Sequence, residues 1–244
     1  MRYIEKNFDA ANVVQHEDEL EKVHLDEARK KKKKQIENLN GKELYKQIRS
    51  TEFIPHWRCL QDQLNIDQGG VCCYCGAKLY YPDSQHYSVE HVSPRTSNPE
   101  LVGEYKNLLL SCHSSEEERS EIKRTVTRRK DRKYNYHCDE TKEDNILHYT
   151  PLQQDCASHF TYQLNGEVDG NDNDAKEDIQ TLNLNCKRLT SRRLELLLSS
   201  LYYDNEILPA DLLKKYREEV VKRDDNNNHR EFYFVLADAI GQLL

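Results

Sequence analysis

The sequence predicts an α+β protein in which helical segments at both ends flank a central region of turns and strands. Two observations support this prediction. Apolar residues recur at helical spacing before residue 69 and after residue 181, whereas residues 87–92 have strand character. With 244 residues, the chain is long enough to bury a hydrophobic core and to form one large domain or two small ones.

We expect three regions along the chain. A helical N-terminal region covers 1–69, a central region covers 70–150, and a mostly helical C-terminal region covers 151–244. Within the central region, residues 113–137 form a charged insertion. This organisation places the chemically distinctive residues between two helical arms.

The composition is that of a polar globular protein. Hydrophobic residues make up 36% of the chain and charged residues 32%, and the mean hydropathy is -0.96. The longest apolar stretch, 232–244, is too short to span a bilayer, and residues 1–5 do not open a secretory signal. We therefore expect no membrane segment and a cytoplasmic location. A collagen-like fibre and a fully disordered chain are excluded.

The net charge of -7 is unevenly distributed. Residues 71–142 carry 12 basic and 11 acidic side chains, so their balance is +1 and the rest of the chain carries -8. An acidic total argues against a general nucleic-acid coat protein. The excess acidity lies outside the central region, where the motifs described below occur.

Residues 12–50 have helical character and include six consecutive positive charges from Arg29 to Lys34. Such a run is typical of a solvated helix face, but it also fits a surface that contacts phosphate. A further helix is expected over Ile54–Ile66. Its apolar stripe, which we expect to face the core, consists of Trp57, Leu60 and Leu64.

The helical pattern ends at Asp67–Gly70, and a short segment rich in cysteine and turns follows over Val71–Leu79. Residues 116–133 combine three consecutive glutamates with eight lysines or arginines. This segment indicates an exposed helix or a mobile insertion. Its basic side chains fit either a solvated surface or a nucleic-acid contact that salt would weaken.

Beyond Cys138, alternation around Asn165-Gly166 indicates a hairpin within residues 160–168. A polar, acidic loop is expected over Asp169–Asp178. Three helices are expected after it, over Leu182–Leu201, Ala210–Val221 and Arg230–Leu244.

Eight cysteines without an export signal indicate metal ligands, reactive thiols or small core residues, because disulfides are rare in a reducing cytosol. Cys72 and Cys75 form a C-x-x-C pair on a turn, which presents two thiolates to one tetrahedral cation. Cys112 and Cys138, each next to a histidine, are candidates for the second pair. Cys73 is interpreted as a spare thiol. The remaining cysteines, Cys59, Cys156 and Cys186, are interpreted as core residues.

Four motifs follow in a fixed order. They are the C-x-x-C pair, Glu90-His91-x-x-Pro94, Asn107-Leu108 followed by Cys112, and Cys138-x-x-x-Lys142. Each is common by chance, but all of them in this order are rare. The order resembles that of the HNH endonuclease family, which has the ββα-metal fold, and the resemblance covers about residues 70–142.

Further blocks resemble one branch of that family. These blocks are Pro151–Cys156, Phe160–Tyr162 and Leu182–Asn185. The branch is the HNH component of Septu-type antiphage systems, often called PtuB, including its retron-linked relatives. With these blocks, the resemblance extends over most of residues 50–195.

The resemblance implies a zinc-braced ββα-metal HNH core flanked by helical segments. A structural Zn²⁺ would be held by Cys72, Cys75, Cys112 and Cys138. The implied catalytic residues are His91 as general base, Glu90 and Asp139 as ligands of a catalytic Mg²⁺ or Mn²⁺, Asn107 as support for the loop that orients the histidine, and Lys142 as a phosphate contact. Hydrolysis would leave 5′-phosphate and 3′-hydroxyl ends.

The sequence departs from the family pattern at two places. Cys112 and Cys138 are separated by 25 residues, and a long loop between zinc ligands costs little because closure entropy rises slowly with length. After the last cysteine, where relatives often carry a third histidine or asparagine, stands Asp139. Either Asp139 or Glu140 could complete the active-site metal ligands.

The resemblance also implies partners. The substrate would be nucleic acid, with DNA favoured and an RNA such as tRNA as the alternative. An ABC/SMC-like, PtuA-like ATPase would control the nuclease, since residues 1–244 contain no G-x-x-x-x-G-K-[ST] loop. The rival interpretation is a catalytically inactive zinc-ribbon module that binds nucleic acid or protein. A redox protein using Cys72 and Cys75 is less favoured, because the expected βαβ context is missing.

Overall fold

The computed structural model describes residues 1–30, 40–128, 131 and 134–244. Its helices are α1 (Ala11–Val14), α2 (Glu17–Lys30), α3 (Gly41–Ile48), α4 (Ile54–Gln68), α5 (Glu116–Thr125), α6 (Asp139–Lys142), α7 (Asn173–Thr181), α8 (Lys187–Leu201), α9 (Ala210–Val220) and α10 (Tyr233–Leu243). Its strands are β1 (Tyr87–His91), β2 (Leu108–Cys112), β3 (Phe160–Tyr162), β4 (Val168–Gly170), β5 (Tyr202–Tyr203) and β6 (Glu206–Ile207).

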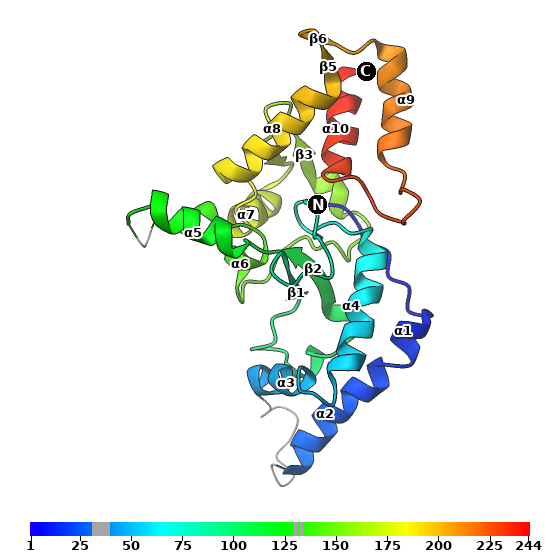
Figure 1. Cartoon of the computed structure of the whole chain (residues 1–244), viewed down its shortest axis with the longest axis vertical. Coiled ribbons are helices and arrows are strands. Elements are labelled where there is room, and N and C mark those ends of the chain that lie inside the picture. The colour runs from blue at the N-terminus through cyan, green and yellow to red at the C-terminus, as the bar shows by residue number, and fades with distance from the viewer. Residues whose placement is uncertain (31–39, 129–130, 132–133) are drawn as a thin grey trace.

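Helices dominate both ends of the elongated molecule, and the small sheets lie between and among them (Figure 1). Helices α1 to α4 form one end, and α8, α9 and α10 form the other. Strands β1 and β2 lie near the middle, and α5 projects to the side. The strands pair as three antiparallel two-stranded sheets in the described part of the chain. The prediction of an α+β protein is confirmed at this level.

The β1–β2 pair is the element that positions the candidate site. Its register places Tyr87 opposite Cys112 at one end and His91 opposite Leu108 at the other. Every residue of β2 is buried, and α4 packs against this strand. The Gln68 side chain at the end of α4 donates to the Leu110 carbonyl (2.8 Å) and accepts from the Leu110 amide (2.7 Å). The Gln68 side chain therefore gives the buried Leu110 amide its acceptor, while the Leu110 carbonyl also accepts from the Cys73 amide (3.1 Å).

The predicted helix of residues 54–66 is confirmed as α4, and its stripe of Trp57, Leu60 and Leu64 is buried in the core. Cys156 and Cys186 also lie in the core, as predicted. The prediction for Cys59 is wrong, because this residue is only partly buried and does not join the core cluster.

The hairpin predicted around Asn165-Gly166 is confirmed by the pairing of β3 with β4. The helix predicted from Leu182 begins five residues later, at Lys187. Residues 182–186 form turns instead, with Asn183 at a positive φ of 48°. The Leu182 carbonyl accepts a hydrogen bond from the Cys138 amide (2.8 Å), so this segment supports the cysteine-bearing part of the chain.

The charged segment 116–133 is helical over α5. Ser115 and Glu118 form a capping box at its start, in which each side chain bonds the other residue's backbone amide. Of the predicted basic runs, Lys31–Lys34 and residues 129–130 and 132–133 lie outside the described residues. Among the described residues, no helix combines the length and apolar character that crossing a bilayer would require.

Candidate functional site

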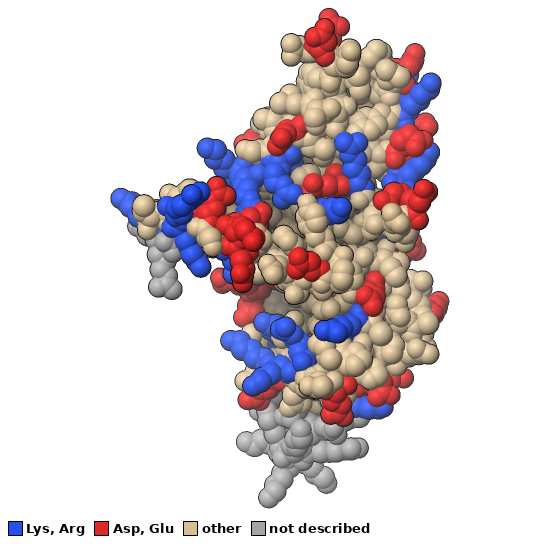
Figure 2. All heavy atoms as spheres, viewed as in Figure 1, with Lys and Arg blue, Asp and Glu red and all other residues tan. Residues whose placement is uncertain are grey.

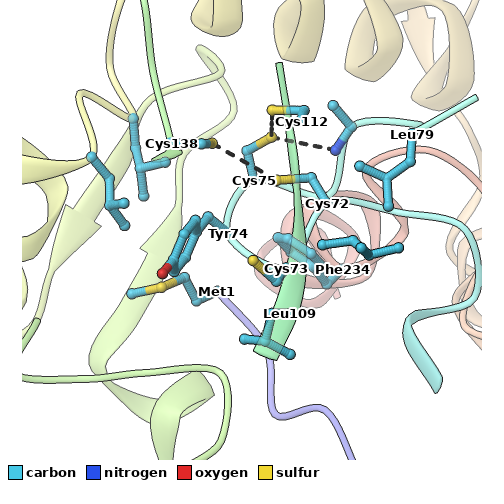
Figure 3. Packing of buried hydrophobic residues seen from close by; sticks show 14 of the residues in the cluster. Met1, Cys72, Cys73, Tyr74, Cys75, Leu79, Leu109, Cys112, Cys138 and Phe234 are labelled. Atoms are coloured by element: carbon cyan, nitrogen blue, oxygen red, sulfur yellow. Dashed lines mark hydrogen bonds between the residues drawn. The ribbon is translucent and has the colours of Figure 1, made fainter. Parts of the chain in front are cut away.

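Four buried cysteines come together from three separate parts of the chain. Cys72 and Cys75 lie on the turn after α4, Cys112 ends β2, and Cys138 directly precedes α6. The four Sγ atoms all lie within 4.8 Å of one another. Figure 3 shows them facing a common centre, with Cys72 next to Cys138 and Cys75 next to Cys112. The cluster could hold a metal ion such as zinc.

The sulfur spacing fits a tetrahedral ion. The Sγ atoms of Cys72 and Cys138 are 3.8 Å apart, and those of Cys75 and Cys112 are 3.6 Å apart. Four sulfurs at about 2.3 Å from a zinc ion would be about 3.8 Å from each other. Burial is the main cause, and the hydrogen bond to Cys112 the second, of a pKa of Cys138 well above its usual value. A cation is therefore needed to keep all four sulfurs ionised.

The turn that carries the first two cysteines depends on Gly76. This residue has a φ of 81°, and a Cβ atom there would lie 2.7 Å from the ring of Phe234 on α10. The next amide, from Ala77, donates to Cys75 Sγ (3.4 Å). The C-terminal helix thus packs onto the turn so closely that only glycine fits at this position.

Two further side chains border the cysteine cluster. His137 Nδ1 lies 3.3 Å from Cys138 Sγ and 3.5 Å from Cys112 Sγ, so its N–H can donate to these sulfurs. Burial raises the pKa of Cys73 well above the usual thiol value, which keeps this thiol neutral. Its place outside the four-sulfur group agrees with its interpretation as a spare cysteine.

A polar pocket of about 360 Å³ lies at the other end of the β1–β2 pair. Glu90, His91 and Asp139 all line it. Its rim carries the cations Lys42 and Arg95 and the carboxylates Glu143 and Asp144. Neighbouring strand residues usually face opposite sides, but β1 ends at His91, and there both Glu90 and His91 reach one pocket.

His91 is held in one tautomer. Its Nε2 lies 3.0 Å from the Val102 carbonyl oxygen, and because a carbonyl can only accept, Nε2 carries the proton. Nδ1 then has a free lone pair and no hydrogen-bond partner among the described residues. Burial lowers the pKa of His91 to about 4, so the ring is neutral at pH 7. A neutral imidazole with a free nitrogen can accept a proton.

Asn107 fastens the loop that supplies this carbonyl. Its Oδ1 accepts from the Ser93 amide (2.7 Å), and its Nδ2 donates to the carbonyls of Ser93 (3.1 Å) and Leu101 (3.3 Å). The side chain therefore joins the beginning and the end of the 93–102 loop. This geometry suits the supporting role expected for Asn107.

Glu90 and Lys142 form a buried ion pair. The Lys142 Nζ lies 2.8 Å from Glu90 Oε1 and 3.3 Å from the His91 carbonyl oxygen, and Tyr74 donates its hydroxyl to the same carboxylate (2.8 Å). The Lys142 side chain is 0% exposed. It cannot reach a phosphate in the pocket from this position, so the expected phosphate contact is corrected to a charge partner of Glu90.

The carboxyl group of Glu90 binds a proton tightly. Burial and the neighbouring Asp139 carboxylate raise the pKa of Glu90 to about 8, and Lys142 offsets only part of this rise. Two carboxylates side by side repel each other unless a proton or a cation lies between them. Carboxylate oxygens are the ligands that Mg²⁺ and Mn²⁺ prefer, so the chemistry of this pair fits a divalent cation.

The structure distinguishes Asp139 from Glu140, the two candidates for the remaining ligand of the active-site cation. Asp139 lines the pocket and accepts a hydrogen bond from the Ser88 hydroxyl (2.6 Å). Glu140 points elsewhere, accepting from the Ser114 amide (2.9 Å) and pairing with Arg119. Successive helix residues are about 100° apart, which explains why the two carboxylates diverge.

Several residues of the site were not found from the sequence. Tyr74 and Ser88 bond the two carboxylates, and Arg95 and Lys42 lie at the rim of the pocket. Ser88 could have been found from the sequence, because residues two apart on a strand share a face and Ser88 lies two residues before Glu90. Tyr74, Arg95 and Lys42 had none, because their positions depend on tertiary packing.

Fold and site together define a mixed helix and small-sheet protein with a four-cysteine candidate metal site beside a carboxylate–histidine pocket. No family model matches the chain. The chain is 31% identical over 114 residues to the "Retron Vc95 putative HNH endonuclease" of Vibrio cholerae serotype O1 biovar El Tor. The match covers 46% of this chain and 46% of that protein, so the chain spans about half the length of the curated relative it matches.

Proposed function

We propose that the chain is an HNH-family endonuclease that hydrolyses phosphodiester bonds in nucleic acid with a divalent cation. The pocket that gathers His91, Glu90 and Asp139 is the observation that carries this proposal. The 31% identity to a protein whose name includes HNH endonuclease supports it. The antiparallel β1–β2 pair followed by α6 is in keeping with a ββα-metal core.

In the proposed reaction, His91 is the general base. Its Nε2–H is fixed by the Val102 carbonyl, so Nδ1 takes a proton from a water molecule in the pocket. The water oxygen bonds to phosphorus as the bond to the 3′ oxygen breaks. The leaving oxygen takes up a proton from solvent, and the products carry 5′-phosphate and 3′-hydroxyl ends.

Glu90 and Asp139 would hold Mg²⁺ or Mn²⁺ at the pocket. A cation held there would supply the positive charge that stabilises the charge developing during the reaction. Lys142 and Tyr74 hold the Glu90 carboxylate in place, and Ser88 does the same for Asp139. These contacts fix both carboxylates before substrate arrives, which reduces the reorganisation needed during the reaction.

A structural Zn²⁺ on Cys72, Cys75, Cys112 and Cys138 would stabilise this arrangement. Cys138 directly precedes Asp139, and its backbone has the unfavourable positive φ of 60°. Such a conformation costs about 1–3 kcal/mol in a residue other than glycine. A metal bond to Cys138 would offset this cost and fix the position of the neighbouring carboxylate.

At a finer level, we propose that the chain is the nuclease effector of an antiphage defence system controlled by an ABC/SMC-like ATPase. The support is the motif order and the similarity to a protein named for a retron. DNA is the favoured substrate, and RNA such as tRNA is the alternative. The acidic balance outside residues 71–142 would disfavour cleavage of nucleic acid before the nuclease is triggered.

Cleavage assays test the proposal. Plasmid DNA and total RNA are incubated with the chain and Mg²⁺ or Mn²⁺, with and without the proposed ABC/SMC-like ATPase. We expect His91→Ala to lower cleavage by about 10²–10⁴-fold while zinc content stays unchanged. His148→Ala, at an exposed histidine away from the pocket, is the matched control. Cleavage that persists in His91→Ala would show that another group is the base. Stoichiometric zinc without cleavage in any arm would favour the inactive zinc-binding module.

A further inference from the structure

A groove of about 660 Å³ lies directly beside the pocket. We call it the tyrosine groove. It is lined by Tyr45, Arg49, Trp57, Arg58, Tyr81 and Tyr87, among others. None of these residues takes part in the proposed hydrolysis, so the groove needs an explanation of its own.

The groove and the pocket share a wall. Val89 lines both of them, and Ser88 lines the groove while its hydroxyl bonds Asp139 in the pocket. The ring of Tyr45 meets the ring of His91 edge to face, with centroids 5.3 Å apart. The groove is therefore the cavity next to the pocket along β1, and a chain molecule whose phosphate occupies the pocket would have it within reach.

On the groove side of the pocket, arginines outnumber the one lining carboxylate, Asp62. Arg49 and Arg58 are exposed, and the guanidinium of Arg95 stacks over the Tyr45 ring, 4.5 Å from its centroid. None of these three arginines forms an ion pair with an acid in the described part of the chain. Figure 2 shows lysines and arginines gathered on this face where α3 lies. Free guanidinium groups on an open groove are suited to phosphate.

The other rim of the pocket has the opposite charge. Glu143 and Asp144 line it, and the two follow α6 directly. In Figure 2, acidic side chains lie between the α3 patch and α5. A polyanion is attracted to the α3 side and repelled from the α6 side. The charge distribution therefore favours one path out of the pocket, which leads into the tyrosine groove.

Aromatic surface lines the same path. Tyr81 and Tyr87 pack with their centroids 5.1 Å apart, and the Tyr81 hydroxyl is fixed by Asp62. Trp57 forms part of the groove wall from the core, with its side chain only 1% exposed. Flat rings combined with arginines are the elements with which proteins hold unpaired nucleotides.

We propose that the tyrosine groove holds a single strand of nucleic acid whose phosphate enters the pocket. Arg49, Arg58 and Arg95 contact successive phosphates, and unpaired bases lie against the tyrosine rings. A duplex would hide its base faces from these rings and gain only the phosphate contacts. The proposal rests on the proposed nuclease function, for which it names the form of the substrate.

Binding without cleavage tests the groove. Fluorescein-labelled 12-nucleotide DNA, RNA of the same sequence and the DNA duplex are titrated with the full chain, without added Mg²⁺ or Mn²⁺, and anisotropy is recorded. We expect a single strand to bind at least about tenfold more tightly than the duplex, because about 1–3 kcal/mol is gained for each stacked base. The DNA and RNA arms then show which polymer is preferred.

Variants link binding to the groove. The double variant Arg49→Ala/Arg58→Ala should weaken single-strand binding about tenfold or more at low salt. It should also reduce the slope of log Kd against log salt by about 1.4, which corresponds to two lost phosphate contacts. Lys214→Ala/Lys215→Ala removes two exposed lysines of α9, at the other end of the molecule, and should change neither quantity.

A second pair of variants tests the aromatic surface. Tyr81→Leu should weaken single-strand binding about fivefold or more, whereas Tyr81→Phe keeps the ring and should retain most of the affinity. Tyr203→Leu, at a tyrosine that is 80% exposed on β5, is the control. Equal effects of Tyr81→Leu on the single strand and the duplex would contradict base stacking.

The experiments distinguish failure of the nuclease proposal from failure of the groove proposal. Groove-dependent binding without cleavage in Mg²⁺ or Mn²⁺, both with and without the ATPase, would overturn the nuclease function and leave the groove as a strand-binding site. His91-dependent cleavage would keep the nuclease, but duplex binding as tight as single-strand binding would overturn the groove proposal. No effect of Arg49→Ala/Arg58→Ala, or no binding of either form, would overturn it as well.

Discussion

The cysteine cluster and the carboxylate–histidine pocket occupy opposite ends of the same β1–β2 pair, yet they are built differently. At one end, Cys112 lies among soft sulfur ligands that are closed off from solvent. At the other, His91 and two carboxylates border an open pocket of about 360 Å³. Closed four-ligand sites serve structure, whereas a site that binds substrate must leave a position open. One hairpin can thus carry a stabilising site at one end and a reactive site at the other.

Removal of a cluster ligand should have the largest effect. Cys75→Ser is expected to abolish stoichiometric zinc and to destabilise the fold by at least several kcal/mol, because metal binding to such sites contributes directly to folding. Zinc content and thermal unfolding measure this. The control is Cys73→Ser, two residues away and outside the cluster. This variant should keep its zinc, and its free energy of unfolding should fall by no more than about 2 kcal/mol. Equal zinc loss in both variants would contradict the assignment of the four ligands.

The second largest effect is expected from the buried ion pair of Glu90 and Lys142 behind the pocket. Above pH 8, where Glu90 is ionised, Lys142→Met leaves its carboxylate buried without a charge partner, which should cost about 3–5 kcal/mol of stability. Adding Glu90→Gln to Lys142→Met should recover much of the loss, although the double variant would lack a cation ligand. Denaturant unfolding measures both. A lack of recovery would mean that packing of the lysine, and not its charge, is the main contribution.

Cation binding at the pocket should also depend on pH. Because burial and Asp139 raise the pKa of Glu90 to about 8, a proton competes with a cation for this carboxylate below pH 8. Apparent Mn²⁺ affinity should therefore fall by up to about tenfold for each unit between pH 8 and pH 6. Calorimetric titration at several pH values measures it. Glu90→Gln should bind more weakly and lose this pH dependence, and a steep dependence in that variant would place the proton elsewhere.

The smallest effect concerns loop support. Asn107→Ala removes the bonds between the ends of the 93–102 loop and should loosen the carbonyl that orients His91. We expect cleavage to fall about tenfold in kcat with little change in KM, since substrate contacts remain. Asn107→Asp keeps the acceptor for the Ser93 amide and should recover part of the activity. A change in KM alone would assign Asn107 to substrate binding instead.

Much of the site could be predicted from the sequence because its motifs are local. The C-x-x-C turn and the Glu90-His91 pair need only neighbouring residues to be recognised. The helices over 54–66 and 210–221 were predicted to within a few residues, because their apolar spacing is regular. The start of α8 was predicted wrongly, because the turn at 182–186 is fixed by its bond to Cys138 in a distant part of the chain.

By itself, the sequence determined which chemical groups are present and in what order, and local periodicity determined most helices. Tertiary structure alone decided how those groups face one another. It turned Asp139 into the pocket and Glu140 toward Arg119, buried Lys142 behind Glu90, and placed α3 beside the pocket. The physical reason is that neighbouring residues on a short helix differ in direction by about 100°, and only packing against β1 and the loops decides which direction is inward.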